Sequence, residues 1–203
     1  MRFLVRPPKL LRRFYKESVW RMNKSEPVIY LTFDDGPIPI LTPWVLDTLK
    51  EYGVKATFFC VGENIHKHPE LFDRLKKEGH QIGNHTYNHV KGWQISKEAY
   101  FENIQKCQQL TQTNLFRPPY GRITKKQYKI LRETYKVIFW DVLSYDYSKS
   151  INPEVCLRKS IKYTRQGSVI VFHDNVKAEQ NLKYVLPLYI KHFLKLNYRF
   201  ETL

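Results

Sequence analysis

Two neighbouring carboxylates, Asp34 and Asp35, are the residues of this sequence best placed to do chemistry. They end the run 29–33, which is apolar, β-branched or aromatic as in a buried strand, and Gly36-Pro37 stops that strand. Because the alternation of side chains relaxes where a strand ends, the two carboxylates can take different tasks. One can bind a metal ion while the other handles a proton. The alternative is an acidic turn, since Asp-Gly is a common turn pair.

His85 and His89 are four residues apart. On a helical turn this spacing puts both imidazoles on one face, where they can reach the same ion. With a carboxylate from another strand end they would form a His-His-Asp set with one coordination position open, as in catalytic zinc sites. The site would hold one divalent ion. We favour zinc, although cobalt, nickel or manganese would also fit these ligands. By itself, a pair with this spacing is also compatible with a structural or incidental role.

Strand and helix patterns alternate from residue 28 to the end of the sequence, which predicts an α/β fold with a parallel sheet and crossover helices. Seven strands are one short of an eight-stranded barrel, and no GxGxxG follows the first strand, so we expect an incomplete barrel. The expected strands are 28–33, 56–62, 81–85, 115–116, 136–142, 168–173 and 198–202, and the expected helices are 42–52, 67–78, 96–110, 124–134, 152–165 and 179–195.

Unusual polar residues follow these strands rather than precede them. In an α/β barrel, reacting groups sit at the carboxyl ends of the strands. The sequence therefore predicts that polar side chains from five strand ends converge on one face: Asp34, Asp35, His85, His89, Arg117, Tyr120, Asp141, Asp146, His173 and Asp174.

Five ordered motifs carry a resemblance to a known family. They are Thr32-Phe33-Asp34-Asp35-Gly36, His85-Thr86-Tyr87-Asn88-His89, Arg117-Pro118-Pro119-Tyr120-Gly121, Trp140-Asp141-Val142-Leu143-Ser144-Tyr145-Asp146 and Val171-Phe172-His173. In order and spacing, residues 27–203 resemble the polysaccharide deacetylases (carbohydrate esterase family 4). The resemblance implies a deformed (β/α)7 barrel. It also implies metal-dependent removal of acetyl groups, N-acetyl above all, from a glycan such as peptidoglycan or a chitin-like polymer.

The resemblance also assigns roles to the first two motifs. It implies that Asp35, His85 and His89 are the metal ligands. Asp34 would be the general base that takes a proton from the attacking water, and Arg117 would pair with it.

The later motifs supply the remaining roles that the resemblance implies. Tyr120 would offer its backbone N–H to the oxyanion, and His173 would be the general acid, oriented by Asp146. Tyr147 and Val171 would line the pocket for the acetyl methyl group.

The sequence departs from the family pattern at two positions. Leu143 stands where many members have Asp, and Tyr147 where many have Trp. These departures bear on the shape of the acetyl pocket and the choice of substrate rather than on the chemistry. Two alternatives stay open: a catalytically inactive glycan-binding barrel, or a metallohydrolase acting on another small amide or ester. An inactive barrel would be marked by loss of Asp34, His85 or His173, and all three are present.

The charge of the chain is strongly basic. Lys plus Arg number 34 and Asp plus Glu 19, a net charge of +15, and residues 1–24 hold eight basic side chains against Glu17 alone. Such a balance favours an anionic partner. We expect a basic N-terminal segment, residues 1–26, with an amphipathic helix over 9–22 that either contacts an anionic membrane or polymer, or docks on the domain with its charges in water. No nucleic-acid-binding signature is visible, so we expect no nucleic-acid partner.

Neither an apolar run long enough to span a membrane nor a secretory signal is visible in the sequence. A cytoplasmic or membrane-peripheral location is therefore expected rather than secretion. The cysteines, Cys60, Cys107 and Cys156, are isolated and odd in number, which argues against a disulfide framework.

Overall fold

The computed structural model describes residues 4–22 and 25–203, and its centre is a parallel sheet. The order of the strands is β5-β4-β3-β2-β1-β7-β6, with β8 pairing separately with β1. This is the incomplete barrel that the alternation predicted, with β5 and β6 at its open edges. The strands are β1 (Val28–Asp34), β2 (Thr57–Cys60), β3 (Gln81–Asn84), β4 (Leu115–Phe116), β5 (Lys136–Val137), β6 (Val142–Leu143), β7 (Val169–His173) and β8 (Arg199–Phe200).

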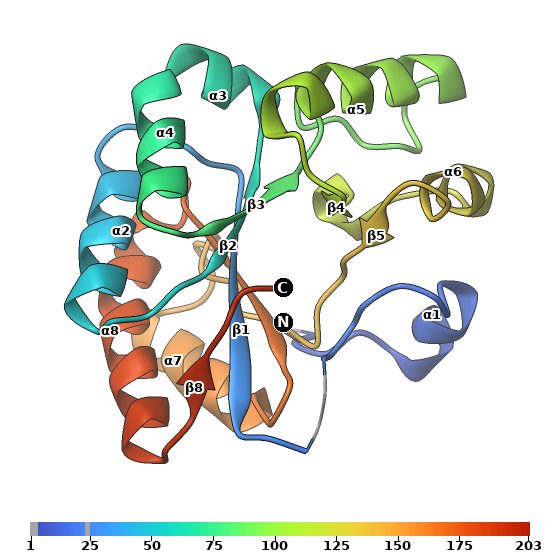
Figure 1. Ribbon diagram of the computed structural model, residues 1–203. Coiled ribbons are helices and arrows are strands. Elements are labelled where there is room, and N and C mark those ends of the chain that lie inside the picture. The colour runs from blue at the N-terminus through green and yellow to red at the C-terminus, as the bar shows by residue number, and fades with distance from the viewer. Residues whose placement is uncertain (1–3, 23–24) are drawn as a thin grey trace.

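Helices cover the outside of the sheet (Figure 1). α8 and α2 lie on one side of the molecule, and α5, α6 and the N-terminal α1 lie on the other. The helices are α1 (Lys9–Phe14), α2 (Leu41–Glu51), α3 (Gly62–Lys67), α4 (Pro69–Lys77), α5 (Lys97–Thr111), α6 (Lys125–Leu131), α7 (Pro153–Tyr163) and α8 (Glu179–Lys195), with a short 3-10 helix at Pro119–Gly121. None of the helices within the described residues is long and apolar enough to cross a bilayer.

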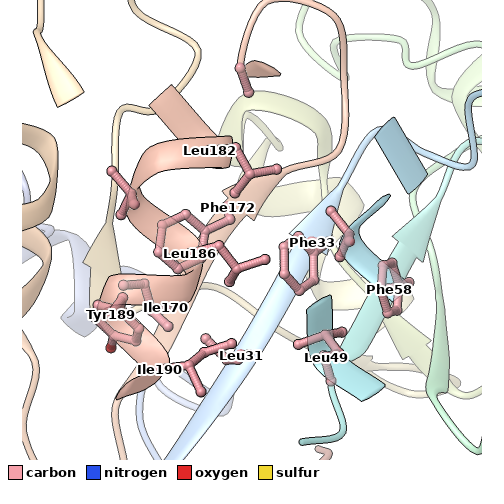
Figure 2. Packing of buried hydrophobic residues seen from close by; sticks show 14 of the residues in the cluster. Leu31, Phe33, Leu49, Phe58, Ile170, Phe172, Leu182, Leu186, Tyr189 and Ile190 are labelled. Atoms are coloured by element: carbon pink, nitrogen blue, oxygen red, sulfur yellow. The ribbon is translucent and has the colours of Figure 1, made fainter. Parts of the chain in front are cut away.

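The main hydrophobic core lies between the sheet and the helices α2 and α8 (Figure 2). Alternate residues of β1 take part in it, because successive side chains of a strand point to opposite faces. Leu31 and Phe33 are fully buried there, and the Phe33 ring stacks on Phe58 at 4.9 Å. Thr32 and Asp34 then face the opposite side, the interior of the barrel. The core thus fixes which side of β1 carries chemistry.

The strand predicted over residues 136–142 is instead two short strands. β5 pairs with β4, whereas β6 pairs with β7 on the other edge of the sheet. Between them the chain crosses the open seam of the barrel, and there the backbone of Phe139 donates to Val19 of the N-terminal segment. The run 137–139 is buried throughout, so its composition resembles one continuous strand even though its partners change.

The N-terminal segment fills this seam. The helix expected over residues 9–22 ends at Phe14, and Val19 and Arg21 form isolated bridges to the barrel. The Trp20 ring stacks on Phe139 at 4.3 Å, and the carbonyl of Val5 accepts a hydrogen bond from the Leu143 backbone. The prediction of a longer helix was wrong because the barrel supplies partners for the backbone beyond Phe14.

Asp141 does not join the other polar residues, contrary to the prediction. Its backbone N–H donates to Val169 at the start of β7, four residues or roughly 13 Å of strand before His173. Its buried carboxylate accepts hydrogen bonds from Arg12, Arg165 and Ser168. Burial raises the pKa of Asp141, but these hydrogen bonds outweigh it and hold the pKa below its usual value. Asp141 therefore anchors the N-terminal segment to the barrel.

We expect Asp141→Asn to lower the free energy of unfolding by about 2 kcal/mol, because the change leaves the surrounding arginines without their buried countercharge. The partial exposure of these arginines keeps the loss below that of a fully buried pair. Urea unfolding measures it. Asp47→Asn is the matched control, since that carboxylate pairs with Arg74 at the surface and should change stability by less than about 0.5 kcal/mol. Equal effects of the two substitutions would contradict the anchoring role.

Candidate active site

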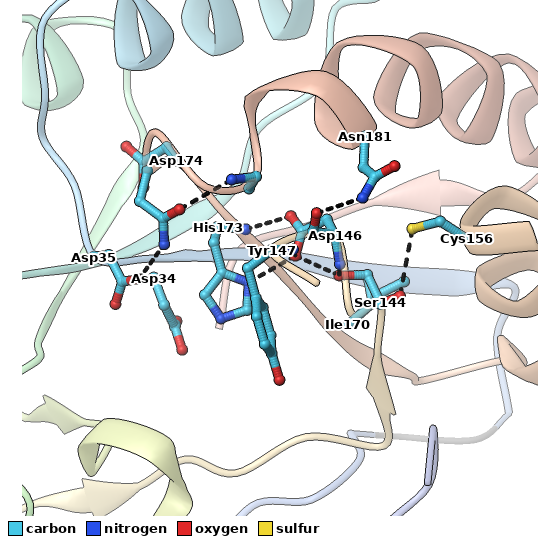
Figure 3. A network of polar contacts seen from close by, with 12 residues as sticks. Asp34, Asp35, Ser144, Asp146, Tyr147, Cys156, Ile170, His173, Asp174 and Asn181 are labelled. Carbon is cyan, nitrogen blue, oxygen red and sulfur yellow. Dashed lines mark hydrogen bonds and ion pairs between the residues drawn. The ribbon is translucent and has the colours of Figure 1, made fainter. Parts of the chain in front are cut away.

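The predicted site residues meet at the carboxyl ends of the strands. Asp34 and His173 are direct neighbours in the register of β1 and β7. Figure 3 shows both beside Asp35, with Asp146 contacting His173 on the side away from Asp34. The cleft there has a volume of about 900 Å³, and the predicted residues that line it are Asp34, Asp35, His85, His89, Tyr120, Tyr147, Val171 and His173.

Asp35, His85 and His89 form a set of potential metal ligands. One ligand atom from each lies within 4.8 Å of the others. The Oδ1 of Asp35 is 3.0 Å from Nε2 of His89 and 3.6 Å from Nε2 of His85. Two imidazole nitrogens and one carboxylate oxygen suit zinc and other divalent transition metals, so the residues present fit the ion that the sequence predicts.

Protonation also suits these residues to metal binding. Burial lowers the pKa of His85 to about 4, so the ring is neutral at pH 7. Its Nδ1 lies 2.8 Å from the carbonyl oxygen of Arg117, a contact that holds the proton on Nδ1 and leaves the Nε2 lone pair facing the site. For Asp35, burial raises the pKa, but the hydrogen bond with His89 and the nearby His173 and His85 bring it well below its usual value.

The backbone around these ligands is unusual. The helical turn expected between His85 and His89 is absent, and the segment is an irregular loop in which Thr86 has φ 64° and His89 φ 55°. Asp35 (φ 84°) and Tyr120 (φ 59°) also adopt left-handed conformations. Such conformations cost energy for residues other than glycine and gather at functional sites. The two imidazoles therefore converge through loop geometry rather than helix periodicity.

Asp34 is held by Arg117, as the sequence predicted. The guanidinium is fully buried, and its Nη1 lies 2.6 Å from Oδ1 of Asp34 and 2.7 Å from the Thr32 hydroxyl. Its remaining donors reach the carbonyl oxygens of Ile138 and Phe139. The other oxygen of Asp34, Oδ2, lies 3.9 Å from Nε2 of His85. One carboxylate oxygen is thus engaged by the arginine, while the other faces the predicted metal ligands.

His173 is oriented by Asp146. The Nδ1 of the ring and the backbone N–H of His173 each lie 2.8 Å from an oxygen of that carboxylate. Burial by itself lowers the pKa of His173, but the negative charges of Asp146, Asp35 and Asp34 outweigh this effect and raise the pKa to about 9. At neutral pH the ring is therefore a cation with a proton to donate. Ser144 donates to the Asp146 carboxylate (2.9 Å) and fixes its position.

Two asparagines that hold Asp35 in place were not predicted from the sequence. The side-chain amide of Asn175 donates to Oδ2 of Asp35, and that of Asn64 donates to its backbone carbonyl at 2.7 Å. Asn175 lies just beyond β7, so the strand-end rule could have found it. Asn64 lies in α3 and carries no such signal.

Asp174, predicted to join the convergent face, supports the turn after the carboxylates instead of facing the cleft. It accepts hydrogen bonds from the Gly36 backbone (3.1 Å) and the Thr42 hydroxyl (2.6 Å). Burial raises its pKa to about 7. A Cβ at Gly36 would lie 1.9 Å from Oδ2 of Asp174, so only glycine fits this turn.

The remaining predicted residues surround His173 and the ligands. The Tyr147 ring meets the His173 imidazole edge-on at 4.7 Å, and the Tyr120 ring lies 4.7 Å from that of His89. Val171 and Leu143 line the cleft on the Tyr147 side. Apart from Asp141 and Asp174, each residue predicted to converge here lies at the cleft or contacts a residue that lines it.

Comparisons with known proteins agree with this geometry. The polysaccharide deacetylase family model matches residues 21–136, more than half of the chain. A peptidoglycan-N-acetylglucosamine deacetylase of Bacillus cereus is 33% identical over 191 residues, which cover 90% of this chain and 89% of that protein. The chain belongs to the polysaccharide deacetylase family. It spans only 57% and 33% of two longer peptidoglycan deacetylases.

Solved structures confirm the (β/α)7 barrel. A crystal structure of a peptidoglycan N-acetylglucosamine deacetylase superposes with a TM-score of 0.89 at 32% identity, covering 97% of this chain and 94% of that one. A family pseudoenzyme from Bacillus anthracis shares the fold with a TM-score of 0.81 at 22% identity, covering 92% of this chain and 67% of that one. Because an inactive relative has the same fold, activity must be argued from the residues of the site.

His85→Ala should abolish metal binding, because the change removes one of three potential ligands and the buried nitrogen that Arg117 orients. The measurement is the zinc or cobalt content of protein that is stripped with chelator, reloaded and dialysed. The exposed His66 is the matched control, and His66→Ala should retain the metal. Full occupancy in His85→Ala would remove His85 from the ligand set.

Proposed function

We propose that this protein is a metal-dependent hydrolase that removes acetyl groups, N-acetyl in the first place, from a glycan. The observation that carries the proposal is that one cleft contains three potential metal ligands and two groups for proton transfer. Asp34 is paired with a cation, and His173 with an anion. Peptidoglycan or a chitin-like glycan is the substrate class that we favour.

The three ligand residues would hold one divalent ion, with zinc favoured over cobalt, nickel or manganese. Such an ion polarises a carbonyl group and lowers the pKa of a coordinated water. The chain's own contribution is to fix the ligands: Arg117 orients His85, and Asn64 and Asn175 orient Asp35. All three residues line the cleft, so an ion that they held would be accessible from it.

Asp34 would act as the general base. Its Oδ1 is held by Arg117, so the free Oδ2 next to His85 can take a proton from the water that attacks the acetyl carbonyl. The two adjacent carboxylates thus take separate roles through their different partners.

His173 would act as the general acid. Asp146 occupies its Nδ1, so the Nε2 proton is the one available to the departing amine. The backbone N–H of Tyr120 would stabilise the oxyanion, and Tyr147 and Val171 would contact the acetyl methyl group. The positive φ of Tyr120 sets the direction of this peptide group.

Two alternative functions remain to be compared with this proposal: a catalytically inactive glycan-binding barrel and a metallohydrolase with a different substrate. An inactive glycan-binding barrel is disfavoured, because the base, the acid and all three potential ligands are present and correctly paired. A metallohydrolase acting on another small amide or ester would use the same groups, and only a panel of substrates separates it from a deacetylase.

The test is acetate release from N-acetylglucosamine oligomers and from peptidoglycan fragments, with protein that is stripped of metal and then given zinc or cobalt. We expect metal-dependent release, and a loss of roughly 100- to 10,000-fold in Asp34→Asn, the usual contribution of a general base. Asp73→Asn, at an exposed carboxylate of α4, is the control and should be fully active. Unchanged turnover in Asp34→Asn would defeat the base assignment, and metal-bound protein that releases acetate from neither substrate would defeat the substrate class.

A further inference from the structure

Helix α1 presents apolar side chains to solvent. Of its six residues, none is buried, although Leu10, Leu11 and Phe14 are apolar. Leu10 is 62% exposed and Phe14 47%. These two residues are four apart and form neighbours on one side of the helix. A surface helix of a globular protein normally packs such an apolar pair against the core, so the outward orientation of this pair requires an explanation.

The cause is Arg12 on the opposite side of the helix. Its Nη2 donates to the buried Asp141 carboxylate at 2.9 Å, and its guanidinium lies 5.7 Å from the Trp20 ring. Leu10 and Phe14 are each two residues from Arg12, about 200° around the helix. The ion pair that anchors the N-terminal segment therefore forces these two apolar side chains outward.

Basic side chains surround this pair. Lys9 and Arg13 of α1 and Lys16 just beyond it are exposed, and Nζ of Lys125 lies 4.0 Å from the Phe14 ring. Through Lys125 the basic surface continues onto α6, which lies on the same side of the molecule (Figure 1). Lys126 and Lys129 are also exposed there. We call Lys9, Leu10, Arg13, Phe14, Lys16 and Lys125 the α1 surface.

The α1 surface adjoins the catalytic cleft. Leu11, next to Leu10 in the helix, lines that cleft together with Leu4, Pro7 and Pro8. The same segment thus contributes an apolar wall to the cleft and an apolar, basic face to solvent. Whatever binds the α1 surface is brought next to the mouth of the site.

We propose that the α1 surface docks the protein on an anionic lipid bilayer. Exposed Leu and Phe side chains surrounded by Lys and Arg have the composition of interfacial helices, in which the cations meet lipid phosphates and the apolar side chains enter the headgroup boundary. The docked orientation places the cleft beside the membrane surface. In combination with the proposed deacetylase activity, on which this last step rests, it identifies the substrate as a glycan held close to a membrane.

The test is co-sedimentation of the full chain with vesicles of phosphatidylcholine alone or mixed with phosphatidylglycerol. We expect binding to the anionic vesicles, little binding to the neutral ones, and loss of binding at high salt. Leu10→Ser/Phe14→Ser should weaken the binding to anionic vesicles by about tenfold or more, since two apolar side chains no longer enter the interface. Lys9→Gln/Arg13→Gln should weaken it and reduce its dependence on salt.

The matched controls lie on α8, on the other side of the molecule (Figure 1). Tyr184 and Leu188 form an exposed apolar pair with the same spacing, so Tyr184→Ser/Leu188→Ser should bind vesicles normally, as should Lys191→Gln/Lys195→Gln. Acetate release from soluble oligomers should be unchanged in the Leu10 and Phe14 variant, because neither residue lines the cleft.

No binding to anionic vesicles, or equal losses in the α1 and α8 variants, would overturn the proposal. The proposal would also be overturned if the full chain bound no vesicles and Leu10→Ser/Phe14→Ser raised the KM for soluble oligomers, since the α1 surface would then bind the glycan itself. Vesicle binding does not depend on catalysis. Its failure can therefore be distinguished from failure of the proposed deacetylase activity.

Discussion

The structure depends on one fully buried arginine. Arg117 follows β4, and its guanidinium contacts Asp34 and Thr32 of β1 and the carbonyl oxygens of Ile138 and Phe139 in the seam. Burying a guanidinium is costly unless its charge and its donors find partners, and here Asp34 supplies the charge while Thr32 and the two seam carbonyls accept further hydrogen bonds. The backbone carbonyl of the same residue orients His85. One residue thus positions the proposed base and one proposed metal ligand, and it ties both to the closure of the barrel.

The two groups proposed for proton transfer have opposite partners. Asp34 contacts a buried cation, whereas His173 contacts the buried carboxylate of Asp146. Each pair comes from different strands, so the relative position of base and acid follows from the register of β1 and β7. A carboxylate and an imidazole held side by side in this way can accept and donate protons in general acid–base catalysis.

Much of this arrangement could be predicted from sequence, because it follows from local composition. The apolar run that ends in Asp34 and Asp35 specifies a buried strand with carboxylates at its end, and the rule for strand ends then gathers the histidines and Arg117 at one edge. The predictions failed where composition does not determine the partner. Residues 136–142 are apolar whether they form one strand or cross a seam, and the spacing of His85 and His89 does not reveal a loop with positive φ. Asp141 follows an apolar run as the proposed catalytic residues do, but it binds arginines that are distant in sequence.

The proposed mechanism requires that Asp35, His85 and His89 hold one divalent ion beside Asp34. Anomalous diffraction at the zinc edge, from crystals of protein loaded with zinc, tests it most directly. We predict a single strong peak about 2.0–2.2 Å from a carboxylate oxygen of Asp35 and from Nε2 of both histidines. If the zinc-loaded protein showed a peak only elsewhere in the molecule, or no peak in the cleft, these three residues would not be the metal ligands.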